Sequence, residues 1–327
     1  MKIRQKGIVL LMVLWIMVIL STMALSFLYM MRLETKMAKY QLYAVEAFYL
    51  AKAGLYRGIM QLTIDKRLNP QIDTLKEGWS VNPKAYEDVT LSRGSFNVKV
   101  IDESSKVNIN TASPGLLRNL PVIKDAENRA EICDSIIDWR DTDSNHELNG
   151  AEDNYYQSLP EPYDCKDGPL DTIEELLLVK GIDEDLLKTP LRSGNRYSED
   201  EGDELRLKDI ITVYGDGKVN VNTADLSVLS CLLGGNVDLA QSIIEYRAGP
   251  DGQDGTKDDQ PFNSISEVRP IIGEAAYGPF SKLIKVNSDI FRIISIGRVK
   301  DSKVTKKIEA VIDRSKSSIR LVYYRED

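Results

Sequence analysis

Histidine, cysteine and excess positive charge are all scarce in this sequence. His146 is the only histidine and stands among acidic and turn residues, so nothing near it suggests a Ser-His-Asp site. The three cysteines, Cys133, Cys165 and Cys231, form no C-x-x-C pair, which removes the usual signature of zinc or redox chemistry. The formal net charge is -8. Because DNA affinity rests largely on cationic contacts to phosphate, this balance argues against a polyanionic ligand.

Charged side chains are also missing from a long run near the N-terminus. The 24 residues 8–31 carry none, and they follow a short head that contains Lys2, Arg4 and Lys6. As a helix this run would be about 36 Å long, which is enough to cross a bilayer. The basic head predicts an N-terminus in the cytoplasm, with everything after residue 31 on the far side of the membrane.

The helix is expected to continue well beyond the apolar run. No proline occurs before Pro70, and apolar residues recur after residue 31 at helical spacing. A secretory signal peptide would instead have a shorter apolar core and a small-residue cleavage site. We therefore predict one helix from about residue 8 to the low sixties. Its stripe, which contains three small alanines, predicts a surface for a partner helix: Leu33, Met37, Tyr40, Ala44, Ala47, Ala51 and Leu55.

Gly7 stands directly before the apolar run, and this layout resembles the type IV pilin class. The resemblance implies that a prepilin peptidase cuts between Gly7 and Ile8 and methylates the new N-terminus. A plain membrane anchor is the alternative. Most members of the class carry glutamate where this chain has Met12. A carboxylate in lipid is costly unless paired, and the class is thought to pair it with the amine of the subunit above, which a tip subunit does not have.

The remaining chain predicts an α+β fold with a large insertion. Segment 95–102 alternates as a strand, and 290–299, 304–312 and 318–324 are β-rich segments separated by polar turns, typical of an antiparallel meander. A long helix on an antiparallel sheet is the type IV pilin-like arrangement. The expected regions are a leader (1–7), a membrane half-helix (8–31), a first pilin part (32–102), an inserted helical domain (103–288) and C-terminal pilin strands (289–327).

The insertion contains an internal repeat. Val107–Ala112 (VNINTA) matches Val219–Ala224 (VNVNTA), and Ser135–Arg140 (SIIDWR) matches Ser242–Arg247 (SIIEYR). We expect two all-α units, over about 107–190 and 219–287, with Thr111 and Thr223 as helix N-caps. The units resemble helix-hairpin-helix or SAM-like folds. A membrane-tethered DNA-uptake protein is therefore the alternative function, although the acidic residues beside the hairpins would repel phosphate.

Nearly the whole chain resembles the protein K family of the general secretion pathway, whose members are minor pseudopilins of type II secretion. The segments that carry this resemblance are 7–31 without the glutamate, 44–58, 107–112, 138–141 with 150–156, and 170–182. The resemblance implies a non-enzymatic subunit of the bacterial inner membrane with its C-terminal domain in the periplasm. It also implies a place at the pseudopilus tip, assistance in pseudopilus initiation and protein export, and a complex with the I- and J-type minor pseudopilins.

Two acidic loops follow the repeated SII-acid-aromatic-Arg segments. Their hard oxygen ligands suit structural calcium, which takes six to eight oxygens in a flexible cage. Solvated surface loops and a carboxylate hydrolase are the alternatives. The predicted ligands are Asp138, Asp141, Asp143, Glu152 and Asp153 in the first loop, and Asp251, Asp254, Asp258 and Asp259 in the second.

Cys133 and Cys165 flank the first acidic loop. Both follow the membrane segment, so a disulfide between them is expected if that compartment is oxidising. Three free thiols are the alternative.

Overall fold

The computed structural model describes residues 3–188, 206–300, 302–316 and 318–327. Residues 1–2 of the expected leader and 189–205 of the expected insertion lie outside this range. The elements in chain order are α1 (Ile3–Leu68), α2 (Pro83–Tyr86), β1 (Val89–Leu91), β2 (Gly94–Asp102), η1 (Glu103–Ser105), β3 (Val107–Asn108), α3 (Pro114–Arg118), α4 (Arg129–Arg140), α5 (Asp153–Tyr156), η2 (Ile173–Leu178), α6 (Glu184–Lys188), α7 (Leu207–Ile210), β4 (Ile211–Thr212), β5 (Val219–Asn220), α8 (Leu226–Leu232), α9 (Val237–Ala248), η3 (Ile265–Val268), α10 (Arg269–Ile272), α11 (Glu274–Phe280), β6 (Ile284–Lys285), β7 (Ile290–Val299), β8 (Thr305–Asp313) and β9 (Arg320–Glu326).

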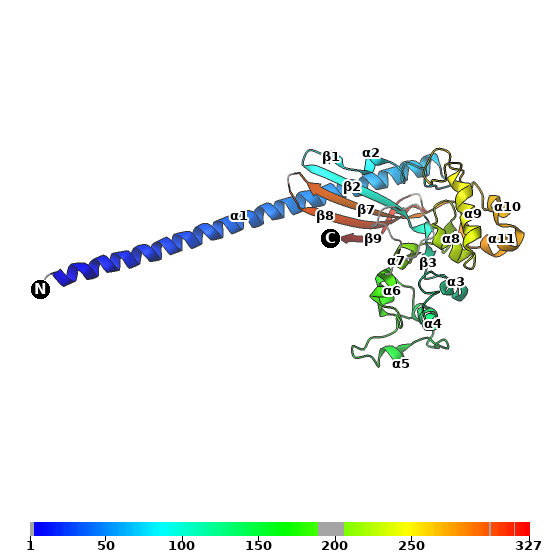
Figure 1. Cartoon of the computed structure of the whole chain (residues 1–327), viewed down its shortest axis with the longest axis horizontal. Coiled ribbons are helices and arrows are strands. Elements are labelled where there is room, and N and C mark those ends of the chain that lie inside the picture. The colour runs from blue at the N-terminus through cyan, green and yellow to red at the C-terminus, as the bar shows by residue number, and fades with distance from the viewer. Residues whose placement is uncertain (1–2, 189–205, 301, 317) are drawn as a thin grey trace.

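Helix α1 projects far beyond the rest of the chain (Figure 1). It is long and apolar enough to cross a membrane by length and composition, and its apolar residues before position 32 are exposed. Its second half packs on the sheet. There the helix comes so close to β7 that a β-carbon on Gly297 would lie 2.2 Å from the Ala47 carbonyl oxygen. Ala47 and Ala51 are fully buried at this contact, so small residues on both elements permit the approach.

A five-stranded antiparallel sheet, in the order β1-β2-β7-β8-β9, packs against the second half of α1. The predicted C-terminal meander is present, because β7 pairs with β8 and β8 with β9. Strand β2 pairs with β7, so that Asp102, where the chain leaves the sheet, lies opposite Phe291, just after the chain returns. This pairing closes the sheet although the two strands are far apart in sequence. The long helix on this sheet confirms the predicted pilin-like α+β fold.

The inserted region has a hydrophobic core of its own and reproduces the repeat in three dimensions. In each copy an asparagine side chain both donates to and accepts from one backbone residue of a later loop: Asn110 with Leu170, and Asn222 with Phe262. In each copy the arginine that ends the repeated SII-acid-aromatic-Arg segment donates to two carbonyl oxygens of the matching VN-x-NTA turn: Arg140 to Ile109 and Ala112, and Arg247 to Val221 and Ala224. The repeated sequence therefore encodes a repeated hydrogen-bond frame.

The units differ from expectation in two details. They are not wholly helical, since short parallel ladders join β3 to β4 and β5 to β6. The N-caps are Ser113 and Asp225, two residues after the predicted threonines. Thr111 and Thr223 still belong to the turns that precede these helices. The Thr223 hydroxyl donates a hydrogen bond to Asp102 instead of capping a helix.

Candidate metal centre and partner surface

The first candidate site is built around the C-terminal end of α4. Asp138 is fully buried there, and its Oδ1 accepts a hydrogen bond of 2.9 Å from the Glu147 amide. The chain passes directly over this carboxylate, because a β-carbon on Gly150 would lie 1.8 Å from Asp138 Oδ2. A side chain at position 150 would displace the carboxylate, so glycine there lets the acidic loop fold back onto α4.

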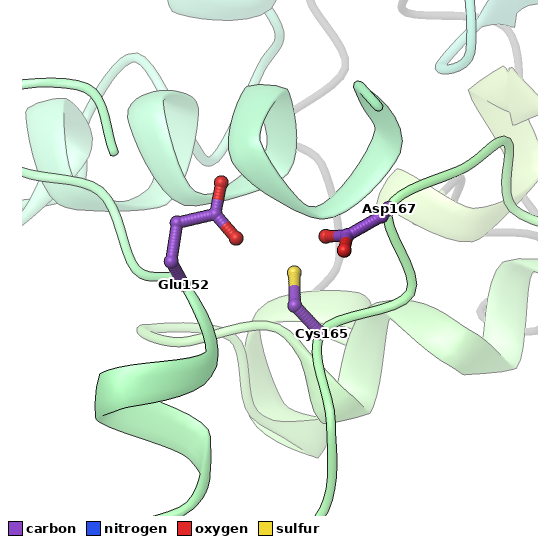
Figure 2. A group of neighbouring side chains, drawn as sticks. All are labelled: Glu152, Cys165 and Asp167. Atoms are coloured by element: carbon purple, nitrogen blue, oxygen red, sulfur yellow. The ribbon is translucent and has the colours of Figure 1, made fainter. Parts of the chain in front are cut away.

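Four carboxylates of this region each have a buried oxygen without a hydrogen-bond partner among the described residues. These atoms are Asp138 Oδ2, Asp141 Oδ1, Glu152 Oε1 and Asp167 Oδ1. Glu152 is only 6% exposed. Figure 2 shows the Glu152 and Asp167 carboxylates directed toward each other and toward the thiol of Cys165, and ligand atoms of these three residues lie within 4.8 Å of one another. Buried oxygens without donors are costly in a folded protein, so this arrangement requires a proton or a cation.

Burial, assisted by neighbouring negative charges, raises the pKa of three of these carboxyl groups, those of Glu152, Asp138 and Asp141. Burial, followed by the charges of Asp167, Asp138 and Asp141, raises the pKa of Glu152 to about 7. Burial also raises the pKa of Asp138 and of Asp141, with smaller contributions from neighbouring acids. No lysine or arginine among the described residues forms an ion pair with any of the four carboxylates. No ion pair in the described part of the chain therefore neutralises the cluster, although the charges of Arg140 and Asp141 interact.

The basic side chains closest in sequence point to other partners. Arg140 holds the backbone turn described above, and Lys166 pairs with Asp171 and Glu175 at 2.7 and 2.6 Å. Cys165 does not supply a thiolate, because burial raises the pKa of its thiol to about 12. The cluster thus offers hard oxygens and a protonated thiol, a donor set that suits calcium better than zinc.

The structure places the predicted ligands of this loop in different surroundings. Asp138, Asp141 and Glu152 each keep an unpartnered buried oxygen among the described residues, and the charges of Asp138 and Asp141 act on Glu152. Asp143 instead accepts hydrogen bonds from Asn145 within its own turn, and Asp153 accepts one from the Cys165 amide. Asp167 was missed, because it lies outside the acidic run and reaches the cluster only through the return of the chain to α4. Asp167 has a φ of 49°, in the left-handed region of backbone conformation that most residues avoid. The adjacent Gly168 is the sequence signal for a turn at this point.

The second acidic loop satisfies its carboxylates internally. Arg247 binds both oxygens of Asp254, at 3.0 and 2.7 Å, and Thr256 donates to Asp258 and Asp259. Asp251 accepts from the Gln253 amide. None of the four belongs to a described group in which three ligand atoms lie within 4.8 Å. The structure therefore does not gather the ligands that were predicted here, because Arg247 of α9 and donors of the loop itself occupy them.

The expected disulfide is also absent from the structure, in which Cys133, Cys165 and Cys231 are free and buried. The Cys165 thiol lies 3.8 Å from the Asp138 carbonyl oxygen. Asp138 follows Cys133 by five helical residues, which corresponds to about 7.5 Å of rise and about 1.4 turns, so the two positions lie about 140° apart around the helix axis. The two sulfur atoms therefore belong to different parts of the α4 surface.

The helix surface predicted for a partner is largely covered by the protein itself. Ala47, Ala51 and Leu55 are buried against the sheet, Ala44 is half-buried, and only Leu33, Met37 and Tyr40 are exposed. The periodicity was right, but most of the stripe faces inward. The opposite side of α1 carries a second apolar stripe that is exposed: Leu42, Val45, Tyr49, Tyr56, Met60 and Ile64. We call this stripe the outer face of α1.

The processing residues lie at the start of α1. Gly7 and Ile8 are both helical and exposed. Met12 lies one turn further along the helix and is also exposed.

Comparisons with known proteins agree with one another. A family model described as type II secretion system, protein K matches residues 94–192. The type II secretion system protein K of Pseudomonas aeruginosa is 23% identical over 92% of this chain and 91% of its own length. The protein of the same name from Pectobacterium carotovorum is 29% identical over 58% of this chain and 62% of its own length. The crystal structure of the GspK-GspI-GspJ complex from enterotoxigenic Escherichia coli contains a chain with a TM-score of 0.64 and 17% identity, matched over 91% of this chain and 99% of that one.

Proposed function

Because this chain belongs to the protein K family of type II secretion systems, we propose that it occupies the tip of the pseudopilus and assists its initiation and the export of folded proteins. It is a minor pseudopilin of type II secretion, and this role replaces the DNA-uptake alternative. The observation that supports the tip is the absence of a glutamate from residues 8–31, where Met12 stands at the usual position. A subunit without a neighbour above it has no amine to neutralise.

The position of the inserted region also supports a place at the pseudopilus tip. It lies at the end of the sheet remote from the N-terminal half of α1 (Figure 1). A body of this size would crowd neighbours within a thin helical filament, whereas it is accommodated at the end. Deletion of the protein should reduce the number of pseudopili, and its overproduction should not lengthen them. Immunogold labelling distributed along filament shafts would refute the tip position.

I-type and J-type minor pseudopilins are the proposed partners, in line with the complex that contains the structural relative. We assign the contact to the outer face of α1, since it is apolar, exposed and continuous over several turns. Val45→Lys with Tyr49→Lys should abolish co-purification with the I-type partner. Arg67→Glu, at an exposed position near the end of the same helix, is the matched control and should leave co-purification intact.

The proposed location is the inner membrane, with one span and the folded part in the periplasm. The single apolar helix supports the span, and the basic head supports the orientation. We also propose that a prepilin peptidase processes the chain after Gly7. Protease added to intact spheroplasts should digest the folded part, and protection of that part would contradict the orientation.

We further propose that the cluster of Asp138, Asp141, Glu152 and Asp167 binds calcium, which orders the first acidic loop against α4. The four buried oxygens without donors support this role. We assign no catalytic step to the cluster. Calorimetry with calcium should detect binding that Asp141→Asn weakens, and an unchanged titration would contradict the assignment.

A further inference from the structure

A second group of carboxylates lies where α1 ends, far in sequence from both acidic loops. Asp65 is in the last turns of α1, and Asp73 and Glu77 are in the connection that leads to α2. Ligand atoms of these three residues lie within 4.8 Å of one another. Asp65 and Asp73 are only 6% and 3% exposed. Carboxylates this close and this buried repel one another unless something neutralises them.

One buried guanidinium serves this group. Arg314 is 2% exposed, donates to Asp65 over 2.9 Å and pairs with Asp73. Glu77 receives hydrogen bonds only from neutral donors, at 3.0 Å from the Thr74 amide, 2.8 Å from the Trp79 indole and 3.3 Å from the Asn69 amide group. Three carboxylates therefore face one cation, which leaves two negative charges when all three are ionised.

The other basic residues near the group form no ion pair with its carboxylates in the described part of the chain, although Lys76 and Lys257 line the adjoining cavity. Lys66 pairs with Asp289 at 3.4 Å and donates to the Arg314 carbonyl oxygen. Burial raises the pKa of Asp73 to about 6 and also raises the pKa of Asp65 and Glu77.

A cavity of about 950 Å³ opens beside the group, and Asp65, Thr74, Glu77 and Trp79 line it. Thr74 is 3% exposed, and its hydroxyl oxygen has no hydrogen-bond partner in the part of the chain that the structure describes. A hydroxyl buried without a hydrogen-bond partner is unfavourable. It therefore supplies a further oxygen, without a partner among the described residues, at the cavity wall that Asp65 and Glu77 also line.

We propose a second divalent-cation site at the wall of this cavity, with Asp65, Glu77 and the Thr74 hydroxyl of that wall and the adjoining Asp73 as protein ligands, and water completing the shell. A doubly charged ion balances the two uncompensated negative charges. Calcium is the ion best suited to it, because it accepts carboxylate, hydroxyl and water oxygens in irregular geometry.

The position of the cavity gives this site a structural consequence. Gly255, Thr256 and Lys257 of the second acidic loop line its other side. The end of α1, the connection after it and the inserted region thus meet around one cavity. A bound ion orders this junction between the pilin part and the inserted part by mass action.

Terbium, which replaces calcium at oxygen sites, tests the proposal in the full chain in detergent micelles. The Trp79 indole nitrogen lies 2.8 Å from Glu77, so excitation of Trp79 sensitises a lanthanide bound here. Trp139 follows Asp138 on α4 and reports on the first centre instead. Trp79→Phe should remove one component of the emission that Trp139→Phe retains, and calcium should compete for that component.

Glu77→Gln is the ligand variant, and it should weaken terbium binding at this component at least tenfold. Glu87→Gln is the matched control, because Glu87 is exposed and outside the group, and it should bind as wild type does. Thr74→Val should weaken binding several-fold. If Glu77→Gln fails to fold by circular dichroism, Thr74→Val and Trp79→Phe decide the question alone.

Two results would overturn the proposal. One is emission that Trp79→Phe leaves unchanged, because the lanthanide would then be elsewhere. The other is a Trp79-sensitised component that calcium does not displace, or that Thr74→Val and Glu77→Gln leave at wild-type affinity, because the group would then be neutralised by protons alone.

Discussion

Glu152→Gln gives the most direct test of the first metal centre, because the substitution keeps the shape of the side chain and removes its charge. The folded protein raises the pKa of Glu152 from 4.5 to about 7. Each pKa unit corresponds to about 1.36 kcal/mol, so ionised Glu152 destabilises the ion-free fold by up to about 3 kcal/mol. A glutamine amide can also donate to the carboxylate oxygens of Asp138 and Asp167 that have no partner.

The sign of the pH dependence follows from the raised pKa. The folded state holds the Glu152 proton more tightly than the unfolded state. The contribution of Glu152 to the free energy of unfolding is therefore greatest below pH about 4.5 and is lost as the pH rises to about 7. Above pH about 7, in chelator, Glu152→Gln should therefore be more stable than wild type by about 1–3 kcal/mol. Near pH 5 this advantage should largely vanish, because most of wild-type Glu152 is then protonated in the folded state.

With calcium bound, wild type should become more stable than Glu152→Gln. An ion present at about a hundred times its dissociation constant stabilises the fold by about 2.7 kcal/mol, and Glu152→Gln should lose much of that gain. Thermal unfolding of the full chain in detergent, followed by circular dichroism with chelator and with calcium, measures both effects. Glu161→Gln, at an exposed position between α5 and η2, is the matched control. A variant less stable than wild type in chelator, or one with the full calcium response, would refute the reasoning.

Four further predictions address the frame, the helix contact, the thiols and processing. Arg140→Ala should destabilise the inserted region by about 2–3 kcal/mol in denaturant unfolding, because two carbonyl oxygens lose a charged donor; an effect below about 0.5 kcal/mol would contradict this frame. Gly297→Ala should cost about 3 kcal/mol or more, measured in the same way, because its β-carbon would meet the α1 backbone; wild-type stability would show that the helix can shift at no cost. Thiol titration in denaturant without reductant should find all three cysteines reactive. One reactive thiol per chain would instead indicate a disulfide, as expected for Cys133 and Cys165. Intact-mass spectrometry should find a chain that begins at N-methylated Ile8, and an unprocessed Met1 start in a strain with active peptidase would exclude cleavage.

The extended elements of this fold were predictable from local sequence. The uncharged run, the absence of proline before Pro70 and the apolar spacing predicted α1, which the structure extends over Ile3–Leu68. Period-two alternation and polar turns predicted β2, β7, β8 and β9 to within a few residues at each end. The repeated VN-x-NTA and SII-acid-aromatic-Arg segments predicted two equivalent units. Such patterns are local, because each residue's neighbours in the chain are also its neighbours in the element.

Local spacing did not decide which surfaces and side chains meet. Periodicity found the stripe on α1 that contains Ala47 and Ala51, but only the approach of β7 assigned it to the interior and left the opposite face exposed. The two acidic loops read alike in sequence, yet Arg247 neutralises Asp254 while Arg140 donates only to backbone carbonyls. The difference between a charged cluster and a satisfied loop is therefore a matter of where one guanidinium points.

The sequence by itself thus determined the membrane helix, the sheet, the insertion and its internal repeat. The tertiary structure alone brought Asp167 to Asp138, and Arg314 to Asp65 and Asp73. Those residues are separated by tens to hundreds of positions along the chain. Their meeting depends on how α1, the sheet and the insertion pack against each other, and a pattern that repeats every two or 3.6 residues carries no record of that packing.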